Sequence, residues 1–61
     1  MTAREREVLT LIVAGKTDRE IAATLFVSRR TVTTHTSNLF VKLGVSGRAE
    51  AAARAVRDNL V

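Results

Sequence analysis

The chain has 61 residues, the length of one small domain, and a net charge of +4. It contains no cysteine and a single histidine, which excludes disulfides, thiolate metal sites and, in practice, a structural zinc site. No segment is apolar for long enough to span a bilayer, and the N-terminus lacks a signal-peptide core. We therefore expect a soluble, cytoplasmic protein without a cofactor, a metal or a membrane association.

Two capping boxes predict the first two helices. In Thr2-Ala3-Arg4-Glu5 and Thr17-Asp18-Arg19-Glu20, a threonine and a glutamate side chain can satisfy the free amides of a helix start. The first helix is expected to run to Gly15, which suits a left-handed C-cap, and the second is expected to be short. The apolar side chains predicted to face inward are Val8, Leu9, Leu11 and Ile12 in the first helix and Ile21, Ala22 and Leu25 in the second.

A third helix is predicted from Arg29 to Leu43, with Ser28 as its N-cap and Gly44 as its end. At about 100° per residue, its sides differ sharply in chemistry. The inward side holds Val32, Thr36, Leu39 and Leu43, flanked by Phe40; the opposite side holds Arg30, Thr33, Thr34, Ser37 and Val41; Thr31, His35, Asn38 and Lys42 line one edge. The outward side is short, polar and free of acids, as a helix that reads bases in a major groove needs to be.

A fourth helix is predicted to open at Ser46 or Gly47 and to continue through the segment RAEAAARAVRDNL. Its inward residues are predicted to be Ala52, Ala55, Val56 and Leu60, and its far side to show Glu50, Arg54, Arg57 and Val61. With the short connections GK and FV, the pattern predicts an all-α, four-helix helix-turn-helix domain whose third helix is the recognition helix. Its predicted core is Val8, Leu11, Ile12, Ile21, Leu25, Val32, Leu39 and Leu43.

The net charge is concentrated in one segment. All six acids lie outside residues 21–49, and the six bases that also lie outside this segment balance their charge. Inside the segment there is no acid, and its four bases are Arg29, Arg30, Lys42 and Arg48. Such a segment favours a polyanionic partner over an ordinary solvated face. An enzyme is excluded, because the sequence has no acid–base pair, nucleophile constellation, glycine-rich phosphate loop or metal site.

The motifs resemble the LuxR-type (GerE-like) helix-turn-helix domain of bacterial transcription regulators. The matching segments are TAREREVLTLIVAGKTDREIA, LFVSRRTV and HTSNLFVKLGVSGRAEA, which together extend from Thr2 to about Ala55. The chain departs from many members at Ala3, where they have proline, at Gly47, where they have asparagine or serine, and on the recognition helix. There Thr33, Thr34 and Ser37 stand where members often have lysine or arginine.

The resemblance implies sequence-specific binding of double-stranded DNA to regulate bacterial transcription, with the third helix in the major groove. Carried over by position, the residues that face bases are Arg30, Thr33, Thr34 and Ser37, and those that contact phosphate are Ser28, Arg29, Thr31, His35 and Lys42. The fourth helix supplies a dimer contact, assigned to Ala53, Arg57 and Leu60. The resemblance further implies a homodimer on DNA that is weak or monomeric in isolation, and a contact with RNA polymerase. Residues 1–61 would be a single output domain excised from the C-terminus of a longer regulator.

Several alternatives remain open from the residues themselves. The basic face could dock an acidic protein in a helical interaction module, or the motif could be the promoter-recognition helix-turn-helix of a sigma factor. His35 is equally well explained as a partly buried structural histidine. Closure of the core alone would account for every residue of the fourth helix.

Overall fold

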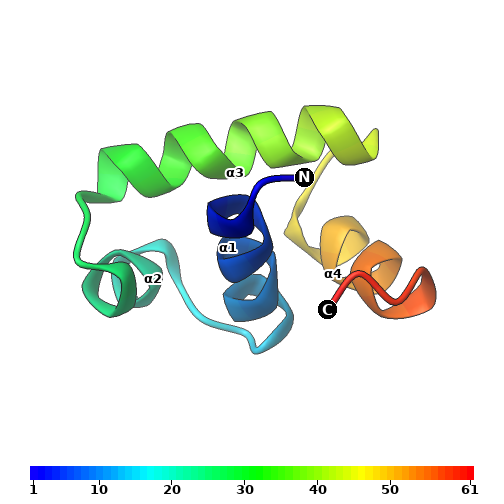
Figure 1. Cartoon of the computed structure of the whole chain (residues 1–61), viewed down its shortest axis with the longest axis horizontal. Helices are drawn as coiled ribbons and strands as arrows, with labels where there is room; N and C mark the ends of the chain where they lie inside the picture. Colours follow the sequence, from blue (N-terminus) through cyan, green and yellow to red (C-terminus); the bar gives the residue numbers. More distant parts are fainter.

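The computed structural model describes all 61 residues and contains four helices and no strand. The helices are α1 (Ala3–Val13), α2 (Asp18–Leu25), α3 (Arg29–Leu43) and α4 (Arg48–Arg57). The longest of them, α3, runs along one side of the molecule, and the other three lie together on its other side (Figure 1). The predicted all-α, four-helix class is therefore confirmed. None of the helices has the length and hydropathy that a membrane span requires.

The predicted N-caps are all present. Thr2 accepts a hydrogen bond from the Glu5 backbone N at 3.1 Å, and Glu5 Oε1 accepts one from the Thr2 N at 2.8 Å. Thr17 and Glu20 repeat this box at the start of α2. The side chain of Ser28 caps α3 by accepting from the Thr31 backbone N. These side chains satisfy amides that have no partner inside the helix, and so they set where α1, α2 and α3 begin. At the start of α4 the N-cap is Gly47, which has no side chain to form such a bond.

The helix ends agree with the predictions at two glycines and differ at α4. Gly15 and Gly44 both have positive φ, at 82° and 67°, and terminate α1 and α3. In contrast, α4 ends at Arg57, whereas the sequence predicted that it would continue to Leu60. Asn59 adopts a left-handed conformation, φ 56°, and the Leu60 N donates to the Ala55 carbonyl oxygen. This tight turn folds Leu60 back toward the core from outside the helix.

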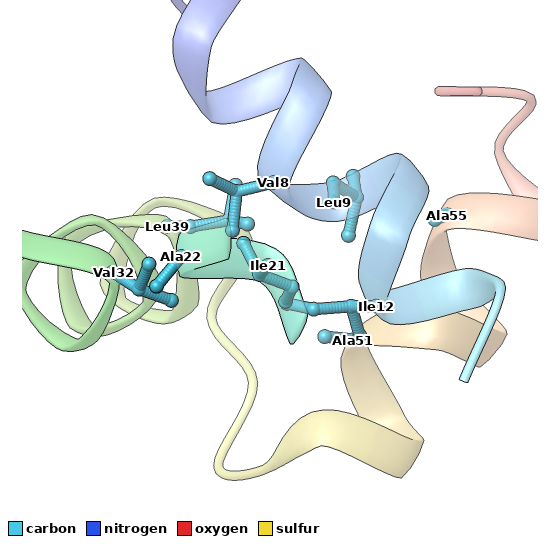
Figure 2. Close-up of a cluster of buried hydrophobic side chains, with 9 residues drawn as sticks. All are labelled: Val8, Leu9, Ile12, Ile21, Ala22, Val32, Leu39, Ala51 and Ala55. Carbon is cyan, nitrogen blue, oxygen red and sulfur yellow. The ribbon is translucent and has the colours of Figure 1, made fainter. Parts of the chain in front are cut away.

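The core is a cluster of nine buried residues drawn from all four helices (Figure 2). Five of the predicted core residues are buried: Val8, Ile12, Ile21, Val32 and Leu39. The other three, Leu11, Leu25 and Leu43, are only partly buried and pack against the cluster from its margin. Leu9, which was predicted to face inward but was not included in the predicted core, is fully buried, because α1 packs against both α3 and α4.

The rotation of α4 differs from the prediction. Ala51 and Ala55 are fully buried, Ala52 is only partly buried, and Val56, which was predicted to face inward, is 65% exposed. The apolar side of this helix consists of alanines of equal size, so the sequence pattern does not distinguish one rotation from its neighbour. The buried alanines also let α4 approach α1 closely, a packing that a larger side chain would obstruct.

On α3, the predicted division between buried and exposed sides is confirmed. Val32, Thr36 and Leu39 are buried, and the five residues predicted to lie opposite are exposed. Thr36 carries the one anomaly: its hydroxyl oxygen is buried and has no hydrogen-bond partner. A buried polar group without a partner costs free energy, about 1–3 kcal/mol.

We therefore expect Thr36→Val to stabilise the domain by about 1 kcal/mol, because valine keeps the shape of threonine and removes the unpaired hydroxyl. For a domain of this size the melting temperature should rise by about 4–8 °C. Leu39→Ala, one turn further along the same buried side, should instead cost about 2–5 kcal/mol. Thermal melts of the three proteins test both; a lower midpoint for Thr36→Val would mean that the hydroxyl has a partner in solution.

Candidate nucleic-acid interface

One side of α3 is covered by no other helix, and we call it the outer face of α3. It consists of Arg30, Thr33, Thr34, Ser37 and Val41, all of which are exposed. The remaining helices all lie on the opposite side of α3 (Figure 1). The structure therefore brings together the four residues predicted to face bases, and Val41, predicted on the same side of the helix, lies at the C-terminal end of this surface.

The threonine hydroxyls on this face are already oriented. Thr33 Oγ1 donates to the Arg29 carbonyl oxygen at 3.1 Å, and Thr34 Oγ1 donates to the Arg30 carbonyl oxygen at 3.1 Å. Each hydroxyl hydrogen is therefore directed along the helix, while the oxygen retains lone pairs that can accept. These side chains can accept hydrogen bonds from base amino groups and can offer methyl groups to thymine.

The N-terminal turn of α3 gathers further groups that suit an anion. Ser28 Oγ and Thr31 Oγ1 lie 2.9 Å apart, and the Ser28 side chain caps the helix. Arg29 and Arg30 are exposed and form no ion pair with any acid of the chain. Because the positive end of the helix dipole disfavours cations, two arginines here are better accommodated when an anion is close.

The other two bases of the acid-free segment are paired through the tertiary structure. Lys42 Nζ lies 2.9 Å from Glu5 Oε1 on α1, and Arg48 Nη1 lies 2.6 Å from Asp18 Oδ1 on α2. Arg48 also donates to the Lys16 carbonyl oxygen. The absence of acids from the segment predicted that all four bases would be uncompensated. This prediction is wrong for Lys42 and Arg48, because their partners lie far away in the sequence.

Glu5 is the most deeply buried ionisable group of the domain. Its side chain is only 6% exposed, whereas that of Lys42 is 52% exposed. The hydrogen bond from the Thr2 backbone N, followed by that from Lys42, lowers the pKa of Glu5 to about 2. The carboxylate is therefore ionised at neutral pH and joins the first turn of α1 to the last turn of α3.

His35 is partly buried at the border between the two sides of α3. Of the predicted phosphate contacts, Ser28, Arg29 and Lys42 are exposed and Thr31 is partly buried. The five residues are distributed along the edge and the N-terminal end of α3, around the outer face.

On α4, the predicted dimer contacts Ala53 and Arg57 are exposed, and Leu60 is partly buried beyond the helix end. Val56, misassigned to the core, adds an exposed apolar side chain to this helix. Arg54, predicted to lie on the far side, donates from Nη1 to the Leu43 carbonyl oxygen at 2.9 Å. Its long side chain thus caps the C-terminal end of α3, a contact that the helical pattern of α4 could not show.

A family model described as bacterial regulatory proteins of the luxR family matches residues 1–55. The chain is 55% identical over 60 residues to the transcriptional regulatory protein YhcZ of Bacillus subtilis (strain 168), covering 98% of this chain and 28% of YhcZ. It is 51% identical over 57 residues to the spore germination protein GerE of the same organism, covering 93% of this chain and 77% of GerE.

Among solved structures, the response regulator ChrA of a heme-sensing two-component system superposes with a TM-score of 0.94 at 40% identity. The match covers 98% of this chain and 30% of ChrA. The chain therefore spans less than a third of YhcZ and of ChrA, and most of GerE.

The lowered pKa of Glu5 predicts a specific loss of stability in acid. The pKa of Glu5 is about 2 in the folded state, and its ordinary value, which applies to the unfolded chain, is 4.5. Ionised Glu5 therefore stabilises the fold fully above about pH 4.5. That contribution should disappear progressively as the pH falls toward 2. Denaturant unfolding of the wild type and of Glu5→Gln at several pH values measures it. The difference in unfolding free energy should be largest near neutral pH and shrink in acid; a difference that is independent of pH would contradict the assignment.

Proposed function

The chain belongs to the luxR family of bacterial regulatory proteins, and on this premise we propose that it binds a specific sequence of duplex DNA with α3 in the major groove. Membership makes it a DNA-binding helix-turn-helix domain of a transcription regulator, and not an enzyme. The observation that carries the proposal is the outer face of α3, which is uncovered, lacks acids and is rich in hydrogen-bonding groups.

In this proposal Arg30, Thr33, Thr34 and Ser37 face the bases. An arginine can donate two hydrogen bonds to guanine, and a threonine can contact the thymine methyl or accept from an amino group. The hydrogen bonds from Thr33 and Thr34 to the backbone support this role, since they orient both side chains before DNA arrives. The short side chains also let the helix backbone approach the floor of the groove.

The phosphate contacts are proposed to be Ser28, Arg29, Thr31, His35 and Lys42. Arg29 carries the strongest support, because it is exposed at a helix N-terminus and has no acidic partner. Lys42 is held by Glu5, yet half of its side chain is exposed and its ammonium has three donors. Phosphate contacts of this kind fix the position of a protein on DNA without reading its sequence.

We propose that two copies bind DNA together through α4 and the turn that follows it, with Ala53, Arg57 and Leu60 at the contact, and that the isolated domain is monomeric or weakly dimeric. The exposed Val56 supports a contact on this helix. Since the chain spans less than a third of YhcZ and ChrA, we further propose that it is the C-terminal output domain of a longer regulator. It would act on chromosomal DNA in the bacterial cytoplasm, with RNA polymerase as a further partner.

The first test is the salt dependence of binding. About four to six phosphate contacts per subunit should give a slope of log affinity against log salt of about −0.9 per contact. Titrations of labelled duplex at several salt concentrations measure it. A flat dependence, or no binding to duplex at low salt, would contradict the proposal and favour a module that docks an acidic protein.

The second test separates base reading from phosphate contact. A duplex selected from random sequence serves as the cognate site, and a scrambled duplex serves as the control. Thr34→Ala or Arg30→Ala should cost about 1–3 kcal/mol on the cognate site and little on scrambled DNA. Lys42→Ala should weaken both alike and reduce the salt slope by about one contact. If Lys42→Ala changes the sequence preference and Thr34→Ala does not, α3 is docked differently from our proposal.

A further inference from the structure

Beneath the exposed ammonium of Lys42 lies a carboxylate that is almost fully buried. Lys42 Nζ is 2.9 Å from Glu5 Oε1, and the two side chains are 52% and 6% exposed. We propose that Glu5 is a positioning residue for DNA binding, because it holds the Lys42 ammonium in place at the edge of α3 to meet a backbone phosphate. The inference rests on the proposed function, and within it on the phosphate contact of Lys42.

The carboxylate is well suited to act as a fixed support. Glu5 Oε1 accepts from the Thr2 backbone N at 2.8 Å and from Lys42 at 2.9 Å, and the Glu5 backbone N donates to Thr2 Oγ1. These bonds lock the side chain into the capping box of α1. Its pKa of about 2 keeps it ionised wherever DNA binding is measured.

Lys42 can be held and still bind. Its ammonium has three donors, of which Glu5 takes one, and the exposed half of the side chain leaves the others accessible to a phosphate oxygen. A free lysine side chain loses rotamer freedom when it binds. In this domain that freedom is restricted before DNA arrives, so phosphate binding requires less ordering.

An opposite effect must be weighed, since the negative charge of Glu5 repels a phosphate. Across about 6 Å, one unit charge changes affinity by about threefold at the dielectric constant of water, and by more at the lower value that applies near a protein surface. Ordering a lysine side chain corresponds to about tenfold or more in affinity. The inference requires that the orienting effect exceed the repulsion, in which case removal of this negative charge weakens the binding of a polyanion.

The chain contains a matched control for the expectation that removing a negative charge weakens DNA binding. Glu20 forms the same capping box at the start of α2, where it accepts from the Thr17 backbone N at 2.9 Å, but it makes no ion pair. Glutamine can replace glutamate in a capping box. Glu5→Gln and Glu20→Gln thus remove one negative charge each from equivalent local positions, and only the first releases Lys42.

The experiment compares Glu5→Gln, Glu20→Gln, Lys42→Met and the double variant Glu5→Gln/Lys42→Met with the wild type. Affinity for the selected duplex is measured at neutral pH and at several salt concentrations, at a temperature where circular dichroism shows each protein to be folded. We expect Glu20→Gln to bind with unchanged or up to about threefold higher affinity. Glu5→Gln should bind about three- to tenfold more weakly, with a salt slope reduced by up to one contact. The double variant should bind no more weakly than Lys42→Met.

The other outcomes overturn the inference in different ways. If Glu5→Gln tightens binding as Glu20→Gln does, Glu5 only neutralises Lys42. If Glu5→Gln weakens binding equally in the Lys42→Met background, its effect does not pass through Lys42. If Lys42→Met binds like the wild type, Lys42 contacts no phosphate and the inference fails, while base reading by the outer face of α3 stands. If the wild type binds no duplex, the proposed function fails with it.

Discussion

The burial of one side of α3 fixes how this helix is oriented against the rest of the domain. Val32 and Leu39, two turns apart, are fully buried against residues of the other helices, and this fixes the rotation of the helix. A rotation by one position would carry Thr33 into the core and expose Val32, at the cost of an unpaired polar group and of lost apolar burial. The outer face of α3 is therefore presented as a consequence of core formation, and its residues are free to be chosen for a partner.

The core contains only nine residues, and polar contacts between helices also hold the helices together. Lys42 joins α3 to α1 through Glu5, Arg48 joins the start of α4 to the α1–α2 region through Asp18, and Arg54 caps the end of α3 through the Leu43 carbonyl oxygen. Each of these three bases thus has a partner on another element of the domain. The cations without an acidic partner near the outer face are consequently Arg29 and Arg30, which places the positive potential at the N-terminal end of the proposed recognition helix.

Val56 and Phe26 are exposed apolar side chains that belong neither to the core nor to the outer face of α3. Val56 lies on α4, beside the surface that we propose as the dimer contact, so its exposure has a rationale within the proposed function. Phe26 ends α2 in a left-handed conformation, φ 57°, and is 94% exposed. Glycine or asparagine would adopt this conformation at lower cost, and nothing in the structure explains the phenylalanine.

The starts of α1, α2 and α3, the extent of α3 and the two sides of that helix can be read from the sequence. These features depend on local hydrogen bonds, such as those of Thr2, Thr17 and Ser28, and on an apolar periodicity marked by large side chains. The rotation of α4 depends on its packing against the other helices, because its alanines do not differ in size. The end of α4 also depends on tertiary contacts, because the left-handed turn at Asn59 folds Leu60 onto the core. The tertiary structure also decided the charge pattern: Glu5 and Lys42 are 37 positions apart, and Arg48 and Asp18 are 30 apart. Contacts between residues so distant in sequence produce no periodic pattern in the sequence, because they arise from the packing of whole helices.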